Sequence, residues 1–121
     1  MADVDVPETE REAAVIPLHR AVAERIAFDR QELRLILNLY GRKVAEGEWR
    51  DYAIDFLKDV AVFSIFRRTS EMPLYRVVKN PALARKQGCY SVTTTGGLIL
   101  KRGQDLARVL QVLDKPVKLV R

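Results

Sequence analysis

The hydrophobic periodicity of the chain changes from 3.6 residues to 2 at Gly47, and this change constrains the fold more than any other feature. Upstream of Gly47, apolar residues recur on one helical face: Leu33, Ile36, Leu37, Tyr40 and Val44. Asp29 and Glu32 have the spacing of a capping box, in which each side chain accepts a backbone N–H of the other residue. We therefore expect a helix from Asp29 to Gly47, with Gly47 as its left-handed terminator. Gly41 inside this helix suggests that another group packs closely against it.

Downstream of Gly47, apolar residues alternate with polar ones, which predicts strands. We expect these at about residues 51–56, 60–67, 74–79, 90–94 and 98–101, with a tight turn at Gly96–Gly97. A second amphipathic helix follows from Leu106 to Leu113 and stops before Pro116, and residues 117–120 could add a last strand. Two helices flanking a run of sequential strands predict the α+β class: an antiparallel sheet of about five strands with an N-terminal and a C-terminal helix packed on it.

The domain organisation follows from composition. Residues 1–17 are acidic and lack sustained periodicity, so we expect a mobile tail there and a single α+β domain over residues 18–121. Residues 18–28 fit both a helical stripe and a strand, and both alternatives stay open.

Charge is unevenly distributed along the chain. Residues 61–121 contain twelve Lys and Arg but three Asp and Glu, a net charge of +9, whereas residues 1–25 carry a net charge of −3. Such a bias attracts anionic partners, whether nucleic acid, acidic protein or lipid headgroup. The strand ends and the approach to the second helix supply the candidate anion-binding residues, which are Arg67, Arg68, Arg76, Lys101 and Arg102.

No combination of residue types typical of catalysis or metal binding is evident in the sequence. Cys89 is the single cysteine and His19 the single histidine, so neither has a second soft ligand or an obvious activating base. We therefore expect no cofactor and no metal. The cysteine count and the absence of an 18-residue apolar run favour a cytoplasmic protein that does not enter a membrane.

The run from Gly47 to Tyr52 holds the candidate partner-binding residues Trp49, Arg50 and Tyr52, because aromatic residues and arginine are common interface anchors. Alternatively, Trp49 closes the core where helix meets sheet. Carboxylates at Glu48, Asp51 and Asp55 could form an acid/base or cation site, although strand acids at this spacing usually line a solvated face.

Several runs resemble a family of short alphaproteobacterial proteins that is described as a domain of unknown function. They are Phe28-Asp29-Arg30, Tyr40-Gly41-Arg42, Gly47-Glu48-Trp49-Arg50-Asp51-Tyr52-Ala53-Ile54-Asp55, Phe66-Arg67-Arg68, Glu71, Pro73-Leu74-Tyr75-Arg76, Gln87-Gly88-Cys89-Tyr90 and Leu100-Lys101-Arg102-Gly103. The similarity spans about residues 28–113. It implies a cytoplasmic bacterial protein and assigns no activity, cofactor or partner.

These observations order three hypotheses. The first is a non-enzymatic protein-interaction module, which could also self-associate into a homodimer. The second is binding of RNA or DNA through the basic second half. The third is an enzyme that uses Glu48, Asp51 and Asp55.

Overall fold

A computed structural model describes residues 25–68 and 72–114 of the chain. It contains helix α2 (Arg30–Ala45), strands β1 (Asp51–Phe56), β2 (Ala61–Phe66) and β3 (Tyr75–Lys79), a 3₁₀ turn η1 (Pro81–Leu83), strands β4 (Tyr90–Thr94) and β5 (Ile99–Gly103), and helix α3 (Leu106–Asp114). The predicted α+β class is therefore confirmed. The proposed acidic tail and the proposed last strand at residues 117–120 lie outside the described residues.

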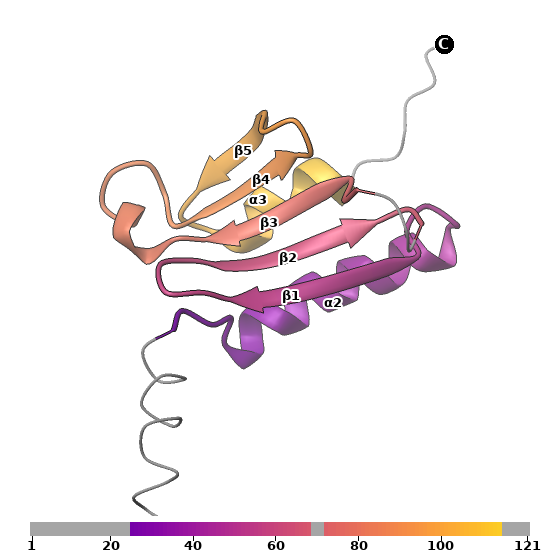
Figure 1. Cartoon of the computed structure of the whole chain (residues 1–121), viewed down its shortest axis with the longest axis horizontal. Helices are drawn as coiled ribbons and strands as arrows, with labels where there is room; N and C mark the ends of the chain where they lie inside the picture. The colour runs from indigo at the N-terminus through magenta and orange to yellow at the C-terminus, as the bar shows by residue number, and fades with distance from the viewer. Residues whose placement is uncertain (1–24, 69–71, 115–121) are drawn as a thin grey trace, which may run out of the picture.

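The five strands form one antiparallel meander in the order β1-β2-β3-β4-β5 (Figure 1). Every strand pairs with the strand that follows it in sequence. Short turns connect β1 to β2 and β4 to β5, and longer segments precede β3 and β4. β1 and β5 are consequently the two edge strands, and each has one side without a described partner strand.

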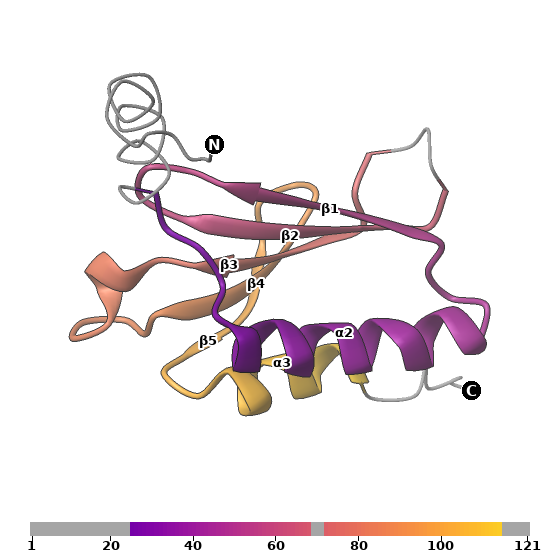
Figure 2. The same cartoon turned by 90° about the horizontal axis from the view of Figure 1, so that it is seen from below.

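Both helices lie on the same side of the sheet (Figure 2). The core fills the space between the helices and the sheet. Its largest fully buried side chains come from α2, α3 and the three central strands: Ile36, Phe63, Ile65, Val77, Val92 and Val109. No described helix covers the opposite face, which we call the open face.

Local signals explain how α2 begins and ends. The carboxylate of Asp29 accepts the N–H of Glu32 at 2.8 Å, and Glu32 Oε1 accepts the N–H of Asp29 at 2.8 Å, which confirms the capping box. Gly47 has a φ of 80°, as expected for the residue that turns the chain out of the helix. The close packing expected at Gly41 is wrong, because a Cβ there would meet nothing within 4 Å outside its own helix.

Residues 25–28 lead into α2 without helical structure, and the N–H of Ile26 donates to the carbonyl of Leu57 at 2.8 Å. This short segment therefore runs past the end of β1. Phe28 is 5% exposed and joins the core just before the helix starts. The four described residues of the segment 18–28 form neither a helix nor a strand, and residues 18–24 lie outside the described residues.

Candidate interaction surface

Helix α2 has three distinct sides, and each meets a different environment. Ile36 and Leu39 are buried against the sheet. Leu35 and Arg42 belong to the side that faces α3, where Arg42 donates to Asp114 at 2.8 Å. Leu33, Leu37, Tyr40 and Val44 recur on the remaining side, which faces away from α3 towards β1.

A contact between aromatic rings shows that this third side borders strand β1. The rings of Tyr40 and Tyr52 lie edge to face with centroids 4.9 Å apart, and Tyr52 stacks on Phe63 at 4.8 Å. Because side chains alternate along a strand, Ile54 and Phe56 point to the same side of the sheet as Tyr52. The apolar side of α2 that carries Tyr40 and the apolar side of β1 that carries Tyr52 therefore meet at this ring contact.

Much of the apolar surface on these two sides is exposed. We call it the β1-edge surface and define it by its exposed apolar residues, which are Leu37 (37% exposed), Val44 (41%), Tyr52 (40%) and Phe56 (38%). Scattered exposed apolar residues are normal on proteins, but a group of them beside an edge strand, such as β1 within the described sheet, is typical of an interaction site.

The backbone of β1 adds hydrogen-bonding groups to the same surface. Leu57 N–H donates to Val60 at 2.9 Å, and the β1–β2 register continues from this pair to Asp55 opposite Val62. In an antiparallel ladder, alternate residues bond inwards, so the N–H and C=O groups of Tyr52, Ile54 and Phe56 point outwards from the edge.

The other edge strand, β5, is built differently. It carries Lys101, Arg102 and Gly103, and its pairing with β4 contains an irregularity between Val92 and Thr93. Positive charges and bulges are the usual means of preventing an edge strand from pairing further. β1 contains no Lys, Arg, Pro or Gly and pairs with β2 in unbroken register. β1 thus lacks the cations and the irregularity of β5, and its charged residues are the acids Asp51 and Asp55.

The predicted partner-binding residues occupy different environments. Tyr52 is 40% exposed on the β1-edge surface, and Arg50 is exposed just before β1 begins. Trp49 is 5% exposed in the core and packs near Tyr40 and Tyr75. This arrangement matches the alternative interpretation, in which Trp49 closes the core where the helix meets the sheet. Its side chain offers little area to a partner. The sequence did not point to Leu37, Val44 or Phe56 as contact residues. The spacing of apolar residues is the same whether another part of the chain buries them or leaves them exposed to solvent.

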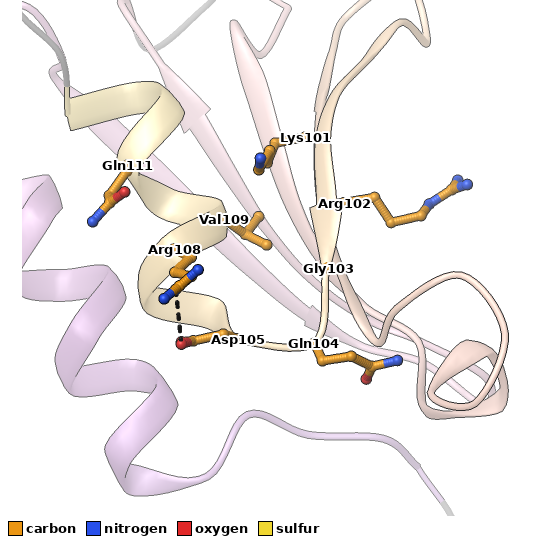
Figure 3. Close-up of a pocket in the computed structure, with 8 residues that line it drawn as sticks. All are labelled: Lys101, Arg102, Gly103, Gln104, Asp105, Arg108, Val109 and Gln111. Carbon is orange, nitrogen blue, oxygen red and sulfur yellow. Dashed lines mark ion pairs between the residues drawn. The ribbon is translucent and has the colours of Figure 1, made fainter.

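The predicted anion-binding residues do not gather at one point. Strand alternation and register place Arg76 and Arg102 on the open face. Lys101 points instead towards α3, on the opposite side of β5 from Arg102 (Figure 3). Arg67 and Arg68 follow the end of β2. Arg102 also donates to Gln87, so part of its hydrogen-bonding capacity is used within the chain.

Lys101 lines an open groove of about 680 Å³ between β5 and α3. Arg108 also lines it and forms an ion pair with Asp105 at 3.7 Å, while Asp105 accepts the N–H of Ala107 at the start of the helix (Figure 3). The carboxylate of Asp105 thus occupies the helix N-terminus, where a bound anion would otherwise be favoured. Lys101 and Arg102, the two cations that precede α3, point to opposite sides because they are consecutive residues of strand β5.

A buried polar cluster ties α2 to the sheet. Glu32 is 7% exposed, and its carboxylate accepts hydrogen bonds from Lys79 Nζ at 2.8 Å and from the Tyr90 hydroxyl. Lys79 Nζ also donates to the carbonyl of Ala27 at 2.9 Å. Burial and the hydrogen bond to Glu32 raise the pKa of Tyr90 above its ordinary range. Because donors within the chain satisfy both oxygens of Glu32, the cluster is suited to holding the fold together.

The three carboxylates considered for catalysis do not converge either. Asp51 and Asp55 lie on the open face, separated by four residues of extended chain or about 13 Å. Asp51 accepts the N–H of Tyr52 at 2.8 Å, and Glu48 precedes the strand. Within residues 25–68 and 72–114, no three His, Cys, Asp or Glu side chains are arranged to hold a metal ion.

Cys89 is partly buried where β4 begins, and burial raises the pKa of its thiol. A raised pKa leaves less thiolate at neutral pH, which is the opposite of what a nucleophilic cysteine requires. His19 lies outside the described residues. Separately, none of the helices in the described part of the chain is long and apolar enough to span a bilayer.

Comparison with known proteins gives one match. A protein-family model described as "Protein of unknown function (DUF2794)" matches residues 26–110. No curated protein and no solved structure matches the chain.

Proposed function

The chain belongs to the DUF2794 family, whose description leaves its function open, and we propose that it acts as a non-enzymatic protein-interaction module in the bacterial cytoplasm. The β1-edge surface is its contact site. The observation that carries this proposal is the coincidence of an edge strand that has no second partner strand within residues 25–68 and 72–114 with exposed apolar side chains from a neighbouring helix.

Two kinds of interaction are available at this surface. A partner strand would bond to the outward N–H and C=O groups of β1, and such strand addition is a recurring mode of protein recognition. Tyr52 and Phe56 would add apolar contact below the strand, extended by Leu37 and Val44 on α2. Backbone bonds and buried apolar area together supply both the orientation and the affinity of a complex.

The experiment is crosslinking of the tagged full-length chain in its native cells, with identification of the products by mass spectrometry. Leu37→Glu introduces a charge within the β1-edge surface. Leu98→Glu is the matched control, because Leu98 is 64% exposed in the turn between β4 and β5. We expect Leu37→Glu to abolish the crosslinked product and Leu98→Glu to retain it, with circular dichroism showing that both variants fold. Absence of any product, or equal loss in both variants, would refute the proposal.

A second candidate function, nucleic-acid binding, is favoured by the position of Arg76 and Arg102 on the open face, which no described helix covers. Arginine side chains that bind phosphates release condensed counterions, so the affinity must fall steeply as salt increases. The test is fluorescence anisotropy with labelled single-stranded RNA and double-stranded DNA at 20–200 mM salt, using Arg76→Gln as the variant. No binding at the lowest salt would eliminate this candidate.

The cytoplasmic part of the proposal is supported by cysteine usage. Cys89 is the single cysteine in the sequence and is partly buried, so the chain has no intrachain disulfide to form. Proteins of oxidising compartments more often depend on disulfides, particularly when they are small.

A further inference from the structure

We propose that the occupant of the β1-edge surface is a second copy of this chain, with the two β1 strands paired antiparallel about a twofold axis at Ile54. This inference rests on the proposed function and names its partner. The result is a dimer with a continuous sheet, in which each copy presents the same surface to the other, as a twofold interface requires.

The outward backbone groups of β1 fit this register. With Ile54 opposite the partner's Ile54, the two residues exchange both of their N–H···O=C bonds. Tyr52 then lies opposite the partner's Phe56, and this pair exchanges bonds in the same way, as does its symmetry equivalent. Every outward N–H and C=O of β1 is therefore used, because the outward residues all have even numbers and the register pairs even with even.

The side chains on the helix side of the sheet also match. Tyr52, Ile54 and Phe56 face the same side as α2 and are respectively 40% exposed, partly buried and 38% exposed in the single chain. In the proposed register, each of them meets only an aromatic or branched apolar side chain of the partner. Aromatic and β-branched cross-strand pairs are among the more stabilising ones.

Charge on the open face selects this register over its nearest competitor. With Ile54 on the axis, Asp55 lies opposite the partner's Ala53, and no acid opposes another. With Ala53 on the axis, Asp51 would lie opposite the partner's Asp55, twice per dimer. Directly opposed like charges destabilise a strand pair. Self-pairing centred on Ile54 is therefore more stable than self-pairing centred on Ala53, given the sequence Asp51-Tyr52-Ala53-Ile54-Asp55.

Helix α2 contributes the second layer of the interface. Its exposed Leu37 and Val44 lie on the side that faces away from α3, next to β1. In Figure 1, α2 follows the β1 side of the sheet. Extension of the sheet through β1 brings the two α2 helices next to each other under the new strand pair, which covers these side chains.

In the single chain, two side chains form hydrogen bonds with outward backbone groups at the two ends of β1. Asp51 accepts the N–H of Tyr52 at 2.8 Å, and Arg25 Nη1 donates to the carbonyl of Phe56 at 3.2 Å. Both hydrogen bonds are exposed to solvent, so water or another backbone group can replace them. Ile54, on the axis, has no such side-chain partner among the described residues. The proposed pairing therefore requires no displacement at Ile54 and replaces the contacts of Asp51 and Arg25 at the two ends of the strand.

The test uses the full-length chain and sedimentation equilibrium over a range of concentrations. A dimer of twice 13.8 kDa is expected. Ala53 is exposed, so its substitution leaves the core intact. Ala53→Asp places a charge opposite the partner's Asp55 and should weaken the dimer by about 2- to 30-fold, whereas Ala53→Lys should strengthen it by a similar factor. Ile99→Asp is the control, since register places Ile99 on the same face at the other edge of the sheet.

The sign of the Ala53→Lys effect distinguishes the registers, because pairing centred on Ala53 would oppose two lysines and weaken the dimer. Mixed disulfide trapping gives a second measurement. In a background with Cys89→Ser, Ala53→Cys and Asp55→Cys chains should crosslink when mixed and not when kept separate, because only the mixture places cysteines directly opposite each other.

The outcomes separate this inference from the proposed function. A monomer at all concentrations that still crosslinks to a different protein in cells, in a manner sensitive to Leu37→Glu, refutes self-pairing and leaves the interaction module in place. A monomer with no crosslinked product refutes both. A dimer insensitive to both Ala53 substitutions, without mixed crosslinking, refutes the β1 interface.

Discussion

Replacing Glu32 by glutamine tests the buried polar cluster most directly. Glu32→Gln keeps the size of the side chain and removes its charge. The amide has one acceptor oxygen in place of two, whereas three donors approach this position, from Asp29, Lys79 and Tyr90. At least one donor must then face the amide NH₂ or lose its partner.

The magnitude follows from burial. The Lys79–Glu32 pair is separated by 2.8 Å, and its side chains are 17% and 9% exposed. A fully exposed pair contributes about 0–1 kcal/mol, and breaking a fully buried one costs about 3–5 kcal/mol. We place this pair between the two, at about 2 kcal/mol, and a lost hydrogen bond at the carboxylate adds about 1 kcal/mol. We therefore expect the free energy of unfolding to fall by about 3 kcal/mol and the melting temperature by about 10 °C.

Urea unfolding followed by Trp49 fluorescence measures this effect, because Trp49 is the single tryptophan and is buried in the folded chain. Lys79→Met alone should destabilise the chain as well, since it leaves the Glu32 carboxylate without its cation. The double variant should lose less than the sum of the two single variants, because neither charge is then left without its partner. A loss below about 0.5 kcal/mol for Glu32→Gln would show that the cluster behaves as a solvated surface pair and would refute this reasoning.

Four further predictions concern single residues. Tyr90→Phe should cost about 1.5 kcal/mol at neutral pH. The pKa of Tyr90 is higher in the folded chain than the value of about 10 for an unfolded tyrosine. The difference in free energy of unfolding between the parent and Tyr90→Phe should therefore be complete below about pH 10 and shrink above it. A difference that grows as the pH rises would contradict the hydrogen bond between Tyr90 and Glu32. Gly88→Ala should destabilise by about 2 kcal/mol or more, since Gly88 has a φ of 107° and a Cβ there would lie 2.7 Å from the backbone of Gly103. Gly41→Ala, with open space at its Cβ, should instead stabilise by about 0.5–1 kcal/mol, and thermal melts compare the two. Iodoacetamide should alkylate Cys89 several-fold more slowly in the folded chain than in urea at neutral pH, because burial raises the pKa of the thiol; equal rates by mass spectrometry would contradict this.

Local signals made the fold predictable. The capping box at Asp29 and Glu32 and the terminator at Gly47 depend on residues a few positions apart, and the alternation in β1 needs only its own six residues. The start of β5 differs by one residue from expectation and its end by two, because Arg102 and Gly103 continue the pairing with β4 beyond Lys101.

The candidate surface was less predictable because it depends on contacts between distant segments. The pattern of Tyr52, Ile54 and Phe56 is the same for a central strand as for an edge, and only the sheet order shows that β1 is an edge. The exposure of Leu37 likewise depends on where α3 packs. Trp49 carried two interpretations because residue type alone does not determine burial.

Glu32 caps helix α2 and also bonds to the sheet, and the second of these contacts bears on the order in which the fold assembles. Each hairpin of the sheet closes over a short stretch of chain, whereas Glu32 reaches Lys79 and Tyr90 across 47 and 58 residues. The first helix is the first described element in the chain, yet its anchoring carboxylate has no sheet partners until β3 and β4 have assembled. We therefore expect α2 to dock late, and we expect stopped-flow kinetics to show that loss of these contacts accelerates unfolding more than it slows folding.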